Sequence, residues 1–209
     1  MEGKALLAAG CLTIVTATNV GGVTAQERMV EKAGVDQLEL TVLVYSETDV
    51  AWLPAAQAIA GGLFEDAGIR LVWTPCSPTP EYPGCHRAPA PNEIAVRIVA
   101  RRRDRVSPTC GVAVRPEQLM PSYITLFLDC LIEGSNEFRV KEPIIAGYCL
   151  AHEIAHLLLP VAVHTASGIM QSRLRPIDWQ RASRGGLRFL PEERQQMADA
   201  VRRRLESTR

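Results

Sequence analysis

The chain has 209 residues, of which 47% are hydrophobic and 22% are charged, and both fractions are typical of a soluble globular protein. Lysine and arginine together number 23, as do aspartate and glutamate, so the formal net charge is zero. This composition excludes a largely disordered chain. Because the charges balance, no overall electrostatic field attracts the protein to nucleic acid or to an anionic membrane. The length fits one domain with a sizeable core.

The first 25 residues have the pattern of a secretory signal peptide. Their start is weakly positive, residues 5–15 are nearly all apolar and small, and residues 23–25 read Val-Thr-Ala. We therefore expect cleavage after Ala25 and a secreted or periplasmic protein whose single domain covers 26–209. The apolar run is too short to span a bilayer, and almost no hydrophobic region precedes Cys11, which disfavours a lipoprotein. Stable membrane insertion is not expected.

The first half of the expected domain begins with a strand and a helix. Residues 38–45 are rich in β-formers, which predicts a strand. Apolar residues recur at helical spacing over 56–67, which predicts a helix that ends near Gly68. The candidates for its N-cap are Ser46, Thr48 and Asp49.

Two further strands are predicted over 69–74 and 93–100, with a proline-rich loop over 86–92 before the second one. The basic run 101–103 follows. It is short and has no interleaved aromatic residues, so a solvated strand end explains it better than a nucleic-acid interface does, and no nucleic-acid partner is expected.

The second half adds a short strand over 111–114 and a clearer one over 123–129. A helical pattern then runs over 142–157, with Pro143 suited to its first turn. A last helix is predicted over 191–205, because proline and acidic residues open it and arginines close it. The order of these elements predicts one α/β domain of the α+β type.

Cysteine usage agrees with export. Once the predicted signal peptide is removed, five of the six cysteines remain. Cys76 and Cys85 bracket a stiff proline-rich loop that a disulfide would close, and we expect Cys110 to pair with Cys130, which leaves Cys149 over. None of these cysteines has CxxC spacing, so a zinc site built from cysteines is disfavoured.

The segment 152–156 reads His-Glu-Ile-Ala-His and lies late in a predicted helix. Four-residue spacing puts His152 and His156 on one helix face, one turn apart, where both imidazoles can bind the same ion. Glu153 is rotated about 100° from His152, which suits a general base acting on a water activated by zinc. This pattern therefore predicts a Zn²⁺ site with hydrolytic chemistry.

A catalytic zinc needs a third protein ligand. Leu159-Pro160 disfavours further helix, so the chain must turn directly after the second histidine. His164 follows eight residues after His156 and can fold back toward the ion. Residues 168–170, which read Gly-Ile-Met, come next, and Met170 could form an apolar floor beneath the metal or simply belong to the core.

Together, the segment 152–156, His164 and the segment 168–170 resemble the metzincin zinc peptidases, nearest to the matrixin-like branch. That family has an extended HExxHxxGxxH motif followed by a methionine turn. The resemblance implies one catalytic Zn²⁺ held by His152, His156 and His164, with Glu153 as base. It also implies a twisted mixed sheet of about five strands with two main helices, here with a C-terminal helix in addition. A peptide substrate would lie antiparallel to an edge strand beside the cleft.

The chain departs from that pattern in its turn. Seven residues separate His156 from His164 where the family motif has five, and none of the seven is a glycine. Other third ligands therefore stay open. A carboxylate is the natural substitute, with Asp178 ranked before the late glutamates, and His86 lies in the proline-rich loop. The late glutamates are Glu192 and Glu193.

Four other residues near the motif are expected to have structural roles. Tyr148 and Trp179 are interpreted as packing residues, and Arg173 and Arg175 as solvated loop residues that could line a substrate pocket.

We therefore expect a secreted zinc-dependent metalloendopeptidase that acts on a peptide or protein substrate as a monomer. The alternative is a non-catalytic secreted module that binds zinc or protein on a peptidase-like scaffold, and Glu153 argues against it because such a scaffold needs no base. Hydrolysis of a non-peptide amide stays open. An intracellular regulator is disfavoured by the predicted signal peptide. Residues 26–37 are too few for a propeptide of useful size and contain no cysteine.

Overall fold

The computed structural model describes residues 37–76, 83–101, 109–114, 122–160 and 164–208. The predicted signal peptide over 1–25 and the last two arginines of the run 101–103 lie outside the described residues. Arg101 itself is exposed at the end of a strand, as expected.

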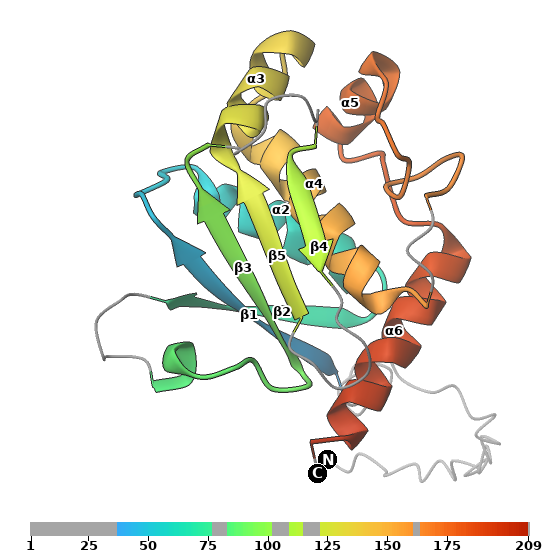
Figure 1. Cartoon of the computed structure of the whole chain (residues 1–209). Helices are drawn as coiled ribbons and strands as arrows, with labels where there is room; N and C mark the ends of the chain where they lie inside the picture. Colours follow the sequence, from blue (N-terminus) through green and yellow to red (C-terminus); the bar gives the residue numbers. More distant parts are fainter. Residues whose placement is uncertain (1–36, 77–82, 102–108, 115–121, 161–163, 209) are drawn as a thin grey trace, which may run out of the picture. The chain divides into compact units, whose positions relative to one another are not determined.

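A mixed sheet of five strands forms the centre of the domain and confirms the predicted fold class (Figure 1). In spatial order the strands are β2 (Ile69–Cys76), β1 (Leu38–Ser46), β3 (Glu93–Val99), β5 (Ser122–Phe127) and β4 (Gly111–Val114). The first four are mutually parallel, and β4 runs antiparallel to β5 at the edge of the sheet. All five strands were predicted from sequence, because each has alternating or β-branched residues between turn signals.

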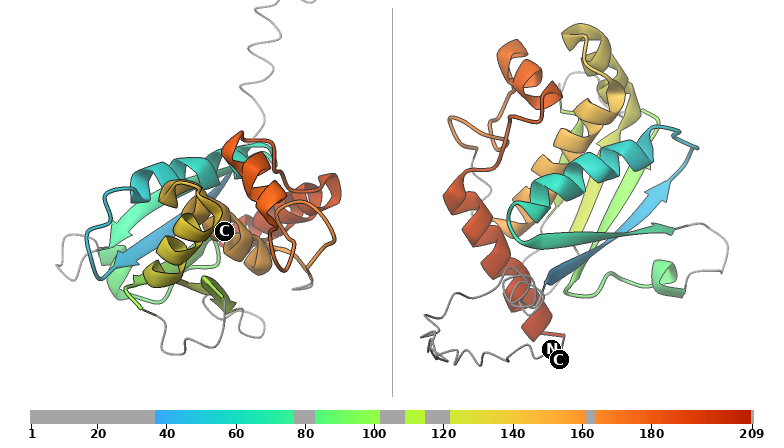
Figure 2. Two further views of the ribbon diagram at one scale, coloured as in Figure 1. Left: turned by 90° about the horizontal axis from the view of Figure 1, so that it is seen from above. Right: turned by 180° about the vertical axis from the view of Figure 1, so that it is seen from behind.

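Five helices complete the described domain. They are α2 (Leu53–Glu65), α3 (Leu128–Phe138), α4 (Glu142–Leu158), α5 (Pro176–Ser183) and α6 (Pro191–Glu206). Helices α2 and α4 pack against each other and cover one face of the sheet (Figure 2). Helix α6 packs against α4 and β1.

The main core lies between this sheet face and the two covering helices. Its fully buried side chains include Leu40, Phe64, Ile94, Leu126 and Ile154. The opposite face carries a small second cluster around Leu43, where the Tyr45 hydroxyl donates a hydrogen bond to the Cys85 carbonyl (2.9 Å). The helix-covered face is therefore the one that holds α4 and its histidines.

Two sequence expectations need correction. The first turn of α2 follows Trp52, and none of the proposed N-caps Ser46, Thr48 and Asp49 caps it. Strand β5 ends at Phe127, so Leu128 and Asp129 open a helix instead of closing the strand predicted over 123–129.

The helices α3 and α5 were also not predicted. Helix α3 contains Gly134, Ser135 and Asn136, which are weak helix formers, so its stability comes from packing against α4 and not from propensity. Helix α5 has only eight residues.

Both expected disulfides are present. Cys76 pairs with Cys85 and Cys110 with Cys130, with Cα–Cα distances of 5.5 and 5.1 Å, and Cys149 is free. The second bridge ties the chain just before β4 to α3. Two disulfides indicate an oxidising environment. Within the described ranges, no helix combines the length and hydropathy that a membrane span requires.

Candidate metal centre

Two histidines project from one face of α4. The helix begins with Glu142 and Pro143 and ends at Leu158, after which Leu159 is extended because proline follows it. Regular helical spacing brings the Nε2 atoms of His152 and His156 to 2.9 Å from each other. Both side chains are half-buried.

The ring of His152 is oriented by a main-chain carbonyl. Its Nδ1 lies 2.9 Å from Ile169 O, which can only accept a hydrogen bond, so Nδ1 carries the proton. Burial lowers the pKa of His152, which favours the neutral ring. In that tautomer the Nε2 lone pair points toward His156, and this is the form in which histidine binds a metal.

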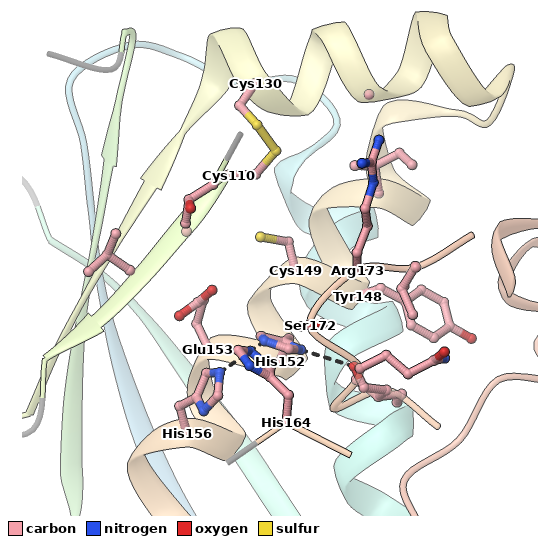
Figure 3. Close-up of a pocket in the computed structure, with 18 of the residues that line it drawn as sticks. Cys110, Cys130, Tyr148, Cys149, His152, Glu153, His156, His164, Ser172 and Arg173 are labelled. Carbon is pink, nitrogen blue, oxygen red and sulfur yellow. Dashed lines mark hydrogen bonds between the residues drawn. A yellow bond between two sulfur atoms is a disulfide. The ribbon is translucent and has the colours of Figure 1, made fainter. Parts of the chain in front are cut away.

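His164 completes a cluster of three imidazoles (Figure 3). Its ring centroid lies 5.3 Å from that of His152 and 5.0 Å from that of His156, and its side chain is exposed. One nitrogen from each ring can be chosen so that all three lie within 4.8 Å of one another. Tetrahedral zinc with Zn–N bonds of 2.0–2.1 Å needs nitrogens roughly 3.3 Å apart, so the cluster fits such an ion with small side-chain shifts.

Glu153 lies beside the histidines on the side of the edge strand. Its carboxylate is buried and accepts a hydrogen bond from the Ala113 N–H of β4. Burial raises the pKa of Glu153 to about 7, although the Ala113 bond partly opposes that rise. A Cβ on Gly111 would lie 2.6 Å from the Glu153 Cγ and 2.8 Å from its Oε1, so only glycine leaves room for the carboxylate here.

The outer edge of β4 presents main-chain groups next to this carboxylate. The Phe127 N–H donates a hydrogen bond to Cys110 O (3.0 Å), so the main-chain groups of Cys110 face β5. Because this pattern repeats every two residues in an antiparallel ladder, the main-chain groups of Val112 and Val114 face β5 too. The main-chain groups of Gly111 and Ala113 therefore face away from β5. Ala113 uses its N–H for Glu153.

A cleft of about 1000 Å³ extends from the histidines between two walls. One wall comes from residues 109–113 and from α3, and the other from α4 and residues 171–174. Its apolar end is lined by Phe138, Tyr148, Leu174 and Trp179. The cleft therefore joins the histidine cluster, Glu153 and the edge of β4 in one open space.

The other candidate ligands are not brought into the cluster. Among the described residues, the three histidines are the only group of three His, Cys, Asp or Glu side chains close enough to hold a metal. Asp178 instead accepts hydrogen bonds from the N–H and Nε of Arg175 (3.1 Å each), and Glu193 accepts one from Leu190 N (2.8 Å). Glu192 is exposed on α6.

His86 belongs to a short 3-10 turn, Pro83–His86, next to the Cys76–Cys85 disulfide. That disulfide belongs to the cluster on the sheet face opposite α4. His86 is therefore outside the candidate centre.

The remaining residues near the motif have mainly packing roles. Tyr148 is buried and its hydroxyl donates a hydrogen bond to Leu187 O (3.1 Å), while Trp179 stacks on Phe138. Met170 is fully buried in the core and does not line the cleft. Arg173 lines the cleft.

Cys149 also lines the cleft, and burial raises the pKa of its thiol well above the usual value. Arg175 is not among the residues that line the cleft, and it forms an ion pair with Asp178.

Sequence reasoning missed Gly111 and Ala113, which hold the Glu153 carboxylate. A glycine inside a strand pattern signals a close approach of another group, and that signal was present at Gly111. It does not reveal which group approaches.

Comparison with known proteins adds no family assignment. No protein-family model matches the sequence, and no curated protein matches it either. The function must therefore be argued from the cleft itself.

Proposed function

We propose that this chain is an exported zinc-dependent metalloendopeptidase. In this proposal His152, His156 and His164 bind one zinc ion, and Glu153 is the general base. The reaction is the one that the metzincin resemblance implies, and export follows from the predicted signal peptide. The two disulfides agree with an oxidising compartment.

The observation that carries the proposal is the combination of the three-histidine cluster with a buried carboxylate in one cleft. Imidazole donors suit zinc and related transition metals, whereas magnesium and calcium prefer oxygen ligands. Three protein ligands leave a coordination position for a reacting group, as catalytic zinc sites do. A carboxylate is rarely buried unless it is paired with a cation, so the burial of Glu153 beside a possible metal site supports a role in the reaction.

Each residue then has a defined task. The Ile169 carbonyl holds His152 in the tautomer that presents Nε2. The Ala113 N–H binds the Glu153 carboxylate, and the absence of a side chain at Gly111 leaves room for that carboxylate next to the histidines, where it takes a proton from water and passes it to the leaving amine. Bound zinc would supply Lewis-acid polarisation of the scissile carbonyl and a lowered pKa for the attacking water.

The substrate is proposed to bind as an extended strand along β4. The N–H and C=O of Gly111 and the C=O of Ala113, which face away from β5, can pair with a peptide backbone, which is the usual way an exposed sheet edge binds an extended segment. The apolar end of the cleft would take a side chain of that peptide.

The decisive experiment measures zinc content and peptide hydrolysis separately. Wild-type protein and Glu153→Ala are loaded with zinc, assayed for bound metal by mass spectrometry, and tested on casein and on a fluorogenic peptide library. We expect one zinc per chain in both proteins and a loss of turnover of roughly 10²–10⁴-fold in Glu153→Ala. Glu65→Ala, which removes an exposed carboxylate from α2, is the matched control and should keep both properties.

Hydrolysis at the wild-type rate in Glu153→Ala would show that the proposed mechanism is wrong. Zinc binding without any hydrolysis in the wild type would favour the alternative of a non-catalytic zinc-binding or protein-binding module.

A further inference from the structure

The third histidine is followed by a closed turn. The Thr165 N–H donates to Met170 O (2.8 Å), and Gln171 Nε2 donates to Gly168 O (2.9 Å). The same turn contacts α4, because the Ile169 carbonyl accepts the hydrogen bond from His152. The residues from Thr165 to Met170 therefore form one unit, which orients a helix ligand and directly follows the loop ligand.

The other side of this turn rests on the segment that leads into α6. The Ile169 N–H donates to Arg188 O (3.2 Å). Gly168 has a φ of +79°, and a Cβ at this position would lie 3.0 Å from Arg188 O and 3.4 Å from Leu190 Cγ. The turn thus lies close against residues 188–190, and both this close approach and the positive φ favour glycine at position 168.

Glu193 joins these two segments through a buried carboxylate. One oxygen accepts the Leu190 N–H (2.8 Å) in the first turn of α6, and the other lies 3.0 Å from the Thr165 hydroxyl. The side chain is 5% exposed. Capping of α6 needs only one of the two oxygens, so capping alone does not explain why the second faces the turn after His164.

The Thr165 hydroxyl has a second acceptor, the Ser167 carbonyl, at 2.8 Å. A hydroxyl has a single proton, so it donates to one of the two at a time. Hydrogen bonds to a carboxylate are roughly twice as strong as those between neutral groups, which favours Glu193 as the acceptor.

We propose that Glu193 is a positioning residue for the third metal ligand: through Thr165 its carboxylate fixes the 164–170 turn to the N-terminus of α6, so that zinc affinity depends on this contact. The inference rests on the proposed function, because it takes His164 as a zinc ligand. The His164 ring is exposed, and an exposed loop ligand loses conformational freedom when a metal binds, so contacts that order its turn beforehand raise the affinity. Outer contacts of this kind typically change metal affinity by 10–100-fold.

The test compares zinc affinity in variants that break the contact from either side. Thr165→Val removes the hydroxyl at nearly constant shape and leaves the Leu190–Glu193 bond intact. Glu193→Gln keeps the side-chain length and one acceptor oxygen but replaces the other oxygen by an NH₂ group, so the charge-assisted hydrogen bond from Thr165 is lost. Zinc dissociation constants are measured by competition with a chromophoric chelator, and the visible absorption of the Co²⁺-loaded proteins reports the ligand geometry.

We expect both variants to bind zinc about 10–100-fold more weakly than the wild type, with a Co²⁺ spectrum altered in the same direction. Thr165→Ser restores the hydroxyl and should restore the affinity. Glu192→Gln is the matched control, because it removes the same charge from the same helical turn on an exposed side chain, and it should bind zinc like the wild type. Thermal unfolding of the metal-free proteins separates any loss of stability from the loss of affinity.

Two results would overturn the inference. If Thr165→Val binds zinc as tightly as the wild type while His164→Ala does not, the turn is positioned by other contacts and only this inference fails. If the wild type takes up no zinc, the proposed function fails as well.

Discussion

The histidines of the candidate centre lie on two kinds of backbone. His152 and His156 are one turn apart on α4, where the hydrogen bonding of a 17-residue helix fixes their spacing, and both rings are half-buried. His164 lies on irregular chain, its ring is exposed, and the turn that follows it is held by residues up to Glu193. The position of the helix half of the centre, His152 and His156, is thus determined by local structure. The position of the loop half, His164, depends on contacts between distant segments.

This difference separates two tasks within one site. The two proposed ligands and the proposed base on α4 have little conformational freedom, because α4 packs against α2 and against strands β4 and β5. The loop half would contribute the third ligand, His164, which directly precedes a turn that a few hydrogen bonds hold in place. Affinity for the metal is therefore expected to respond to changes around the turn that leave the fold of the domain intact.

The largest effect is expected from removing a ligand of either half. His152→Ala should lower zinc affinity by more than about 100-fold, beyond the usual effect of an outer contact. His164→Ala should lower it less, because the exposed loop ligand loses more freedom on binding and a water can take its place. The dissociation constants are measured by chelator competition. Equal losses in the two variants would show that the loop half is as well ordered as the helix half.

A change next to the base should affect turnover and leave the metal in place. Gly111→Ala would put a Cβ within 2.6–2.9 Å of three Glu153 side-chain atoms, so the carboxylate must leave its present position beside β4. We expect peptide hydrolysis to fall by about 10²-fold, which is within the range for loss of a general base, with one zinc still bound.

Gly62→Ala is the control for that variant. It adds the same methyl group to the exposed side of α2, where nothing lies within 4 Å, and should raise the stability of the helix by roughly 1 kcal/mol without a change in turnover. Loss of zinc in Gly111→Ala would mean that the edge strand supports the ligands as well as the base.

The smallest effect is expected at Asp178, the carboxylate that sequence reasoning offered as another third ligand. Asp178→Asn should leave zinc affinity unchanged and reduce the free energy of unfolding by about 1 kcal/mol, because the charge facing Arg175 is lost while one acceptor oxygen remains. Chemical denaturation with and without zinc measures both quantities. A loss of zinc in this variant would move the third ligand from His164 to Asp178.

The same variant has a defined pH dependence. Burial acts to raise the pKa of Asp178, but the hydrogen bonds and charge of Arg175, helped by Gln171, outweigh it and the pKa is lowered. A lowered pKa stabilises the fold above the pKa of the unfolded chain, near 3.9, and that stabilisation disappears as the pH falls through the folded value. The difference between wild type and Asp178→Asn should therefore be constant at neutral pH and shrink below about pH 4.

The same division explains what could be predicted from sequence. Helix α4, the spacing of His152 and His156 and the break at Pro160 follow from periodicity and from the rule for residues before proline, and all were predicted. The contact between Glu153 and Gly111 joins residues about 40 positions apart, and no local pattern encodes it. Glu193 could be recognised as an acid in the first turn of a helix, but its second contact depends on where the turn after His164 packs.

The helices α3 and α5 were missed for a related reason. The residues of α3 follow β5 without a break, and its first two residues extend the strand pattern. Helix α5 does have a start signal, Pro176 followed by Asp178, but only eight residues follow that start. Both elements are stabilised by packing against α4, which periodicity alone does not report.

The order of the chain gives the contact between Glu193 and Thr165 a further consequence. The three histidines are synthesised before α6, so a nascent chain contains all three proposed zinc ligands before it contains the carboxylate that we propose positions His164. A partly made or clipped chain that lacks α6 would hold zinc weakly and turn over little substrate. Under the proposed function, completion of the fold would make the centre competent, and hydrolytic activity would be withheld from chains that are still being synthesised.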